Sequence, residues 1–383
     1  MQHITKAHGL NKRRITRRSF IKKAVLPGAA AGALGFPAIM RASAAAPLKI
    51  RIQTVWGSGN LGYFKFQELC QSIAEVTDGK ILFEGFQGGT VVETSRMFEA
   101  VKSGILDAMH CFDSYWTGIL PVATFLTSYP FGLDRPDQWE TWHNELGGNA
   151  IAQEAYGRHN MHYIGPIQHG DNLIHSRIPL RSFEDFINKR IRFPSGIIAD
   201  VFRLAGVSTV LLPSSEIYPA LANGDIDAAD YVSAAVNYEL GLGDIAKFII
   251  MGPPATPCLH QPVDSMSIEM NLHAWRKIPQ HFQKLIEMAV KKHSYEQYAA
   301  IQAADMIALA KMQQELQVEI IRLSDEDVAK FKRFAPPIWL KWAQKSTLAM
   351  RAFKSQLEFM KSAKLNYISD YEMIDLKGRP LIF

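Results

Sequence analysis

Two predicted strands, joined through a predicted helix, carry the side chains best suited to bind a small charged molecule. Arg190–Ser195 reads as a strand that bears guanidinium groups, and Ser215–Ala222 reads as a helix that ends before Gly224. Asp230 and Tyr231 end the next predicted strand. A planar guanidinium holds a carboxylate through two parallel hydrogen bonds, and carboxylate oxygens are hard ligands for a cation. These residues are therefore the first candidates for a binding site.

A glycine-rich motif points to a different chemistry. Gly57–Gly62 has the pattern G-x-G-x-x-G between a predicted strand and a predicted helix, and Glu84 lies at the end of the following strand. This layout is typical of dinucleotide sites, where helix N-terminal amides hold the pyrophosphate and an acid holds the ribose. However, the preceding strand alternates polar and apolar residues from Lys49 to Gln53, and Trp56 crowds the turn. A glycine-rich loop at the mouth of a binding cleft explains the same residues, so an exported nicotinamide- or flavin-dependent oxidoreductase is the alternative hypothesis.

Histidines and cysteines form no established metal motif. The pairs His159/His162 and His169/His175 fit no zinc spacing, and neither an acid nor a cysteine completes a ligand set. Cys70, Cys111 and Cys258 lie in apolar surroundings without a C-x-x-C, which predicts small buried side chains; one disulfide is the alternative. The sequence also has no G-x-S-x-G, P-loop or H-E-x-x-H motif.

The N-terminal region has the features of an export signal. Thr16–Lys22 is a twin-arginine pattern, an apolar Gly/Ala-rich run follows from Ala24 to about Met40, and Ala42–Ala44 provides a small-residue cleavage site. The run is shorter than the roughly 20 apolar residues that span a bilayer, and no later segment is apolar for long enough. We therefore expect residues 1–44 to be a twin-arginine signal peptide and the mature protein to be periplasmic.

The basic charge of the chain belongs to this leader. The whole chain has a formal charge of +5, but residues 1–44 carry nine of the 42 basic residues and no acidic residue. The remainder has 33 basic and 37 acidic residues, a net charge of −4. Nucleic acid is therefore not an expected partner, because a basic surface that would bind it is missing.

Predicted strands and helices alternate along the rest of the chain, which is typical of an α/β protein. The strands are Leu48–Val55, Lys80–Phe86, Asp107–Phe112, Met161–Ile167, Leu173–Ser176, Arg190–Phe193, Ala228–Val232 and Ser265–Met270; the helices are Leu61–Thr77, Thr94–Ser103, Ile198–Ala205 and Ser215–Ala222, with a helical region around Pro136–Tyr156. About 340 residues are enough for two lobes with substantial cores. We expect residues 45–170 to form lobe I, residues 171–266 to form lobe II, and residues 267–330 to return to lobe I.

Long helices are predicted after Pro279. His281–Gln317 has apolar residues at helical spacing, Val318–Leu323 reads as a short strand, and Ile338–Ala363 is again helical. The last region has an apolar stripe of Trp339, Trp342, Leu348, Phe353, Leu357 and Met360. Residues 331–383 are therefore expected to be a C-terminal helical extension. Its stripe is interpreted either as core or as a dimerisation surface.

The segment around Arg192 resembles the solute receptors of tripartite ATP-independent periplasmic (TRAP) transporters. The shared pattern is K/R-x-R followed by S-E-x-Y-x-A-L-x-x-G-x-x-D-A, here Arg190–Arg192 and Ser215–Ala228. Further matches at Asp78–Lys80, Glu99–Ala108 and Tyr129–Phe131 extend the resemblance over nearly the whole mature chain. Within the family, the chain is most similar to the 2-oxo acid (alpha-keto acid) branch.

The resemblance implies roles for three residues of this segment. Arg192 matches the arginine that forms a bidentate salt bridge to the ligand carboxylate. Asp230 and Tyr231 match an acidic–aromatic pair in which the acid and the aromatic residue's backbone carbonyl contact a bound cation. The branch commonly has Glu-Trp there, so the Asp-Tyr of this chain has a shorter reach and an added phenol.

Two further positions depart from the branch. Asp171 stands where the branch has a glutamine that contacts ligand or metal, with Asn172 beside it, and Gln261 stands where it has an acidic ligand. Together these changes keep one carboxylate but relocate it, so the cation is Na⁺, Ca²⁺ or absent, and Asp264 is a substitute ligand. Oxygen ligands of this kind suit Na⁺ or Ca²⁺ and not Zn²⁺.

Three aromatic residues complete the expected site. Trp56, Tyr115 and Trp116 lie on predicted loops of lobe I that should face the cleft, where they would close over the carbon skeleton of the ligand. Packing in the core is the other interpretation. Aromatic walls would admit a ligand larger than pyruvate.

The resemblance thus implies a two-lobe receptor of the Venus-flytrap type that acts without chemical turnover. It would bind a small 2-oxo or 2-hydroxy monocarboxylic acid, with a bound cation and no organic cofactor, and deliver it to the small and large membrane subunits of the transporter. The branch also implies a homodimer supported by a long C-terminal helix. A receptor of an ATP-driven importer is an alternative that differs only in its partner.

Overall fold

The computed structural model describes residues 46–365 and 369–382, so the predicted signal peptide lies outside the described residues. From Ala46 onward the chain forms one compact unit built on two β-sheets with helices packed on both. Every helix in this part of the chain is too short or too polar to serve as a membrane span. The two-lobe α/β fold expected from the sequence is confirmed.

The first sheet has the strand order β2-β1-β3-β10-β4. Its strands are β1 (Leu48–Thr54), β2 (Ile81–Phe86), β3 (Ala108–Phe112), β4 (Met161–Gly170) and β10 (Asp264–Asn271). β1 pairs in parallel with β2 and β3, whereas β10 runs antiparallel to both β3 and β4. The late strand β10 therefore sits inside a sheet otherwise made by the first part of the chain.

The second sheet has the order β11-β9-β5-β8-β6-β7. Its strands are β5 (Leu173–Ser176), β6 (Arg190–Arg192), β7 (Ser208–Val210), β8 (Ala228–Tyr231), β9 (Phe248–Met251) and β11 (Glu319–Arg322). β6 and β8 are parallel neighbours, with Arg192 opposite Ala229. This pairing brings the carboxyl ends of the two strands singled out in the sequence to the same edge of the sheet.

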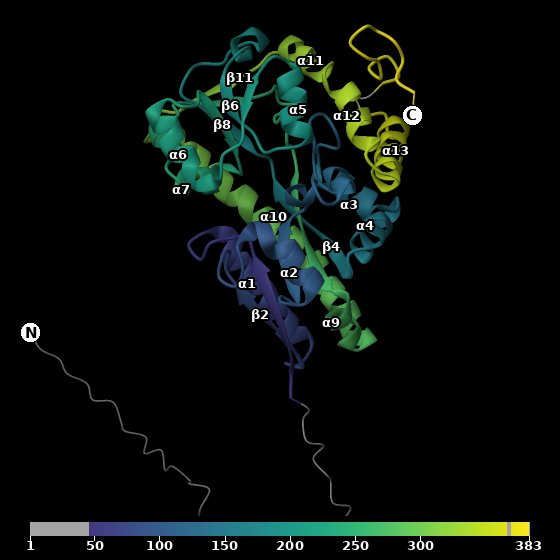
Figure 1. The fold of residues 1–383 in the computed structure, drawn as a ribbon. Coiled ribbons are helices and arrows are strands. Elements are labelled where there is room, and N and C mark those ends of the chain that lie inside the picture. The colour runs from purple at the N-terminus through teal and green to yellow at the C-terminus, as the bar shows by residue number, and fades with distance from the viewer. Residues whose placement is uncertain (1–45, 366–368, 383) are drawn as a thin grey trace, which may run out of the picture. The chain divides into compact units, whose positions relative to one another are not determined.

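Helices connect and cover the strands, as Figure 1 shows. They are α1 (Leu61–Val76), α2 (Met97–Ser103), α3 (Pro136–Glu145), α4 (Gly148–Gly157), α5 (Ile197–Leu204), α6 (Ser214–Asn223), α7 (Ala234–Glu239), α8 (Leu242–Ile245), α9 (Leu272–Lys277), α10 (Gln280–Gln314), α11 (Asp325–Lys332), α12 (Ala335–Ala343) and α13 (Thr347–Ser362), with short 3₁₀ turns η1 (Thr94–Arg96), η2 (Asp113–Trp116), η3 (Pro121–Phe125) and η4 (Phe183–Phe186). Gly224 ends α6 at a φ of 81°, as expected for a glycine C-cap. The long helix α10 packs on β4 and α1 of the first lobe and on α7 of the second.

The chain crosses between the two sheets at three places. Asp171 and Asn172 link β4 to β5, residues 252–263 link β9 to β10, and residues 315–318 lead from α10 to β11. The expected assignment of residues 267–330 to lobe I is therefore wrong for β11, which pairs with β9 of the second sheet. β11 forms the edge of the second sheet beside β9, and its own short sequence does not specify which sheet it joins. The return to lobe I also begins earlier than expected, at Asp264.

The C-terminal stripe is part of the core. The single predicted helix over Ile338–Ala363 is divided into α12 and α13, because the Ser346 side chain caps α13 by accepting from the Ala349 amide. The stripe residues Trp339, Trp342, Leu348, Phe353, Leu357 and Met360 are all buried in one hydrophobic cluster of the same chain. They are therefore not a free dimerisation surface.

Buried histidines make stability depend on pH. His175 lies on β5 with its side chain fully buried and neither ring nitrogen hydrogen-bonded, and burial lowers its pKa to about 4. Because this value lies below the unfolded value of about 6.5, its contribution to stability is complete above about pH 6.5 and is lost as the pH falls toward 4. We expect wild type to lose on the order of 2 kcal/mol more stability than His175→Gln between pH 7 and 4.5, measured by guanidinium denaturation.

Exposed His281 supplies the control. His281→Gln should follow the wild-type pH dependence, since its imidazole is solvated in both states. Parallel pH curves for wild type and His175→Gln would contradict the assignment of His175 as a buried neutral histidine.

Candidate functional site

Arg192 is anchored at the carboxyl end of β6 and points toward β8. Its Nη1 donates to the Asp230 backbone carbonyl at 2.7 Å and to Asp230 Oδ2 at 3.4 Å, while Nε donates to the Leu212 carbonyl at 3.3 Å. Nη2 has no hydrogen bond within the described part of the chain. Arg190, two residues earlier, is exposed and donates instead to the Gly224 carbonyl that ends α6. Arg190 and Arg192 share one face of β6, since residues two apart on a strand point to the same side, but the Arg190 side chain is half exposed whereas that of Arg192, at the carboxyl end, is largely buried.

Asp230 is a fully buried carboxylate with two basic partners. Its Oδ1 accepts a hydrogen bond from His260 Nε2 at 2.7 Å, and its Oδ2 faces Arg192. Burial disfavours the charged form of His260, but Cys258 and the Asp230 carboxylate outweigh it and raise the pKa of His260 to about 10. Asp230 therefore holds two positive groups at one edge of the second sheet.

The crossing segments carry a chain of buried polar side chains. Asn172 Nδ2 donates to Gln261 Oε1 at 3.0 Å, and Gln261 Nε2 donates to Asp264 Oδ1 at 3.0 Å. The Thr127 hydroxyl approaches the same Asp264 oxygen at 3.4 Å. The backbones are tied as well, since the Asn172 amide donates to the Gln261 carbonyl at 3.1 Å. Predicted residues from two distant segments thus meet where the chain passes between the sheets.

Asp264 carries a perturbed carboxyl group at the start of β10. Burial, followed by repulsion from Asp230, raises its pKa to about 8. Asn172 Oδ1, also buried, has no hydrogen-bond partner. A polar region with an unpaired oxygen and a poorly compensated carboxyl group is poised to accept a further positive or hydrogen-bonding group.

The remaining polar and phenolic candidates lie around this centre. Asp171 is partly buried, and burial raises its pKa while His260 acts in the opposite direction. The guanidinium of Arg192 lies 5.5 Å from the centre of the Tyr231 ring. Tyr115 is about half exposed and interacts electrostatically with Tyr231, Asp264 and Arg192. Of the three aromatic residues predicted from lobe I, Tyr115 is therefore the one whose side chain lies at the site and stays exposed to solvent.

Trp56 and Trp116 are packed in the interior. Trp116 is 2% exposed and lies against Phe98, and Trp56 is 5% exposed. The Trp56 ring stacks on His169 at 5.1 Å and meets Phe112 edge-on at 5.5 Å. Both tryptophans thus follow the core interpretation in this structure, although His169 places Trp56 close to the crossing at Asp171.

The glycine motif serves this packing. A Cβ on Gly62 would lie 2.6 Å from the Trp56 indole, whereas Gly57 and Gly59 have open space around them. Glu84, the expected ribose ligand, pairs with Lys49 at 2.6 Å. The third glycine therefore makes room for a tryptophan, and the oxidoreductase alternative is not supported.

This packing gives a direct test. Gly62→Ala should destabilise the protein by about 1–3 kcal/mol, because the new methyl group overlaps a buried ring that has little room to move. Gly59→Ala, in open space and at a backbone angle that any residue adopts, is the matched control and should be nearly neutral. Equal urea midpoints for the two variants would contradict this account of the motif.

The donor atoms at the crossing are oxygens. Within residues 46–365 and 369–382, no set of three or more His, Cys, Asp or Glu side chains is arranged to hold a metal ion. Asp230, Asp264 and the amide oxygen of Asn172 would have to be supplemented by neutral oxygens. Such a donor set fits a hard cation such as Na⁺ or Ca²⁺ and not Zn²⁺.

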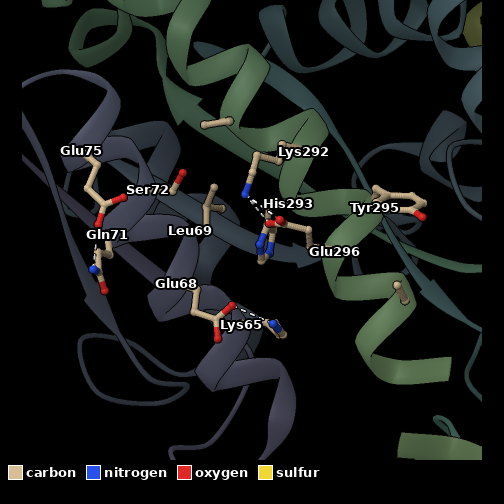
Figure 2. Close-up of a pocket in the computed structure, with 12 residues that line it drawn as sticks. Lys65, Glu68, Leu69, Gln71, Ser72, Glu75, Lys292, His293, Tyr295 and Glu296 are labelled. Carbon is tan, nitrogen blue, oxygen red and sulfur yellow. Dashed lines mark hydrogen bonds and ion pairs between the residues drawn. The ribbon is translucent and has the colours of Figure 1, made fainter. Parts of the chain in front are cut away.

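A large surface cavity lies elsewhere, between α1 and α10 (Figure 2). It has a volume of about 480 Å³, and its charged side chains are largely paired, Lys65 with Glu68 and Lys292 with Glu296. None of the predicted site residues lines it. The crossing region is therefore the better candidate site.

Sequence reasoning missed His260, Cys258 and Thr127. The Cys258 thiol donates to the Asn172 carbonyl at 3.3 Å and lies 3.6 Å from His260 Nδ1. All three cysteines of the chain are buried and free. The sequence offered one signal for His260, namely its position directly before Gln261, which was itself a predicted ligand.

The chain belongs to the DctP family of bacterial extracellular solute-binding proteins, family 7, whose model matches residues 52–346. Among characterised proteins, it is similar to the monocarboxylate 2-oxoacid-binding periplasmic protein of Nostoc sp., with 28% identity over 240 residues. That match spans 62% of this chain and 64% of the Nostoc protein. The family match thus makes this chain a member of the extracellular solute-binding proteins.

Solved structures agree with this assignment. An open, ligand-free TRAP periplasmic solute-binding protein from Rhodobacter sphaeroides is 27% identical, with a TM-score of 0.69 over 83% of this chain and 99% of that chain. A TRAP solute-binding protein from Bordetella bronchiseptica, solved as a mixed-occupancy dimer with calcium and picolinate in one site, is 24% identical, with a TM-score of 0.73 over 83% and 93% of the two chains. The similarity to the Bordetella structure supports the assignment of the fold alone.

Proposed function

We propose that this chain is the periplasmic receptor of a TRAP transporter and binds a small 2-oxo or 2-hydroxy monocarboxylic acid. The observation that carries the proposal is Arg192, held by the Asp230 and Leu212 carbonyls with no hydrogen bond at its Nη2 within the described residues. A fixed, partly dehydrated guanidinium at the edge of a sheet is suited to a carboxylate. The Nostoc relative, named for binding monocarboxylate 2-oxoacids, supports the ligand class.

The other predicted residues would surround the acid from both lobes. Asp171 and Asn172 lie on one crossing segment and would contact its polar atoms. Tyr231 and Tyr115 would flank its carbon skeleton, with Trp56 behind them in the core. Because these side chains come from segments that join the lobes, solute binding would favour a closed arrangement of the two lobes.

A hard cation would complete the site. Asp230, the backbone carbonyl of Tyr231 and Gln261 would hold it, with Asp264 as a further ligand. The cation would polarise and orient the acid and would compensate the buried carboxylates of Asp230 and Asp264. Calcium in the Bordetella neighbour makes it the first ion to test. No organic cofactor is part of the proposal.

Delivery would follow from closure. The closed receptor would present a surface to the small and large membrane subunits and release the acid without chemical change. Export by the twin-arginine route would place it in the periplasm. A homodimer would have to form through a surface other than the buried C-terminal stripe, and light scattering of the purified protein tests that expectation.

Thermal-shift melting after unfolding and refolding to remove carried-over ligand tests the proposal. A panel of 2-oxo, 2-hydroxy, dicarboxylic and aromatic acids would be compared in EDTA, Na⁺ and Ca²⁺. A ligand at a hundredfold excess over its Kd stabilises by about 2.7 kcal/mol, or a few degrees. A shift limited to one acid class and dependent on one cation supports the proposal. Stabilisation by NAD or FAD, with none by any acid, would overturn it.

A further inference from the structure

A second group of acidic side chains is buried inside the first lobe. On β10, Ser267 and Glu269 face the same side of the sheet, and Glu269 lies directly opposite Tyr163 of β4. Across the other edge of β10, Ser267 lies opposite Cys111 of β3, and Asp113 follows two residues later on that side. Strand register therefore gathers two carboxyl groups and two hydroxyl groups on the face covered by α2 and α4.

These oxygen atoms are fully buried and largely unpaired. Asp113, Ser267, Glu269 and Tyr163 are all 0% exposed. Asp113 Oδ1 accepts from the Tyr156 hydroxyl at 2.5 Å, but its Oδ2 and both oxygens of Glu269 have no hydrogen-bond partner. The Ser267 and Tyr163 hydroxyls also have none. Five oxygens without a hydrogen-bond partner thus lie on one buried face. The Ser267 hydroxyl lies near enough to both acids to lower the pKa of each, but its single proton can serve only one of them.

No positive charge compensates the two acids. Burial raises the pKa of Glu269, with repulsion from Asp113 adding to it, and burial raises the pKa of Asp113 to about 6. Within the described residues, no lysine, arginine or histidine is among the groups that shift either pKa. Three carboxyl oxygens therefore lack a positive partner among the described residues.

We infer that Asp113, Glu269, Ser267 and Tyr163 form a buried site for one hard cation, of which calcium fits best. Two carboxylates match its double charge and are ligands that calcium takes, and the two hydroxyl groups would add neutral oxygen atoms. Zinc does not fit, because histidine is missing and the Cys111 thiol is a poor ligand: burial and the neighbouring acids raise its pKa, which keeps it protonated. The ion joins β3, β10 and β4 across the middle of the first sheet and is independent of the solute.

Calcium stoichiometry tests this site on the whole chain, refolded in EDTA and dialysed against calcium chloride without organic acid. Asp230→Asn removes the central carboxylate of the solute site, and this variant should still retain one calcium ion per chain. Glu269→Gln should bind one ion fewer than wild type. Terbium in place of calcium should give luminescence sensitised by Tyr156 and Tyr163 in Asp230→Asn, and the double variant Asp230→Asn/Glu269→Gln should lose it.

Controls separate this site from a merely structural role. Glu84→Gln, at an exposed acid paired with Lys49, should bind calcium as wild type does. If Glu269→Gln does not fold, Tyr163→Phe removes one ligand oxygen while keeping the ring, and it should weaken calcium binding about tenfold. The inference is overturned if Asp230→Asn binds no calcium or if Glu269→Gln binds as much as wild type. It is also overturned if Glu269→Gln melts higher than wild type in EDTA and calcium stabilises neither, because the two acids then share a proton instead.

Discussion

Arg192→Ala should weaken binding of the carboxylic acid by about 30- to 4,000-fold, since removing one partner of a buried, hydrogen-bonded charge pair costs about 2–5 kcal/mol. The guanidinium is already positioned by the carbonyls of Asp230 and Leu212, so the wild-type protein loses little freedom when the acid binds. Isothermal titration calorimetry with the best acid from the thermal-shift panel measures the loss. Circular dichroism should show an intact fold, since Asp230 keeps its bond to His260.

Two arginine variants make the result specific. Arg192→Lys keeps the charge but not the planar fork, and it should recover only part of the affinity. Arg190→Ala removes an exposed guanidinium from the same strand and should leave affinity near the wild-type value. If Arg190→Ala lowers affinity as much as Arg192→Ala does, the effect is a general one of charge and Arg192 does not bind the carboxylate.

Trp339→Ala should cost about 3–5 kcal/mol of unfolding free energy, the largest stability effect that we predict. The Trp339 side chain in α12 is fully buried and packs edge-on against Tyr129 and close to Phe353. Its Nε1 donates to the Pro130 carbonyl at 3.0 Å, so truncation creates a cavity and also leaves a buried acceptor unpaired. Urea denaturation of both proteins measures the difference.

Trp339→Ala also tests whether the C-terminal extension belongs to the core of its own chain or to a dimer interface. Tyr371→Ala, at a residue that is 90% exposed, is the control and should change stability by less than 0.5 kcal/mol. A dimer-interface residue would make the stability loss depend on protein concentration, whereas a core residue would not. A loss confined to low protein concentration would contradict the assignment of Trp339 to the core of its own chain.

Local signals sufficed for most elements of the fold. Alternating and continuous apolar runs predicted nearly all strands, and Gly224 correctly marked the end of α6, because these features depend on neighbours in the chain. The short strands β7 and β9 were not predicted. The sheet to which Val318–Leu323 belongs was predicted wrongly, because strand pairing depends on which edge is open in the folded protein.

The residues of the site also fall into those that the sequence predicted and those that only the folded structure placed. Arg192, Asp230 and Asn172 were predicted as site residues from the resemblance to the TRAP receptors, and the glycine motif was visible but misleading in isolation. Whether an aromatic side chain faces a cleft or the core depends on what packs against it, and the structure buries Trp56 over Gly62 while leaving Tyr115 exposed.

The sequence alone indicated the class of protein, through its resemblance to a known family, and the alternation of strands and helices, and it predicted Arg192 as the ligand of a carboxylate. Only the tertiary structure decided that His260 bonds Asp230 and that Asn172 meets Gln261, 89 positions away. It also decided that Asp113 and Glu269 share one buried face of the first sheet. The physical reason is that hydrogen bonding and burial act between residues close in space, and strand register brings together residues that sequence spacing leaves far apart.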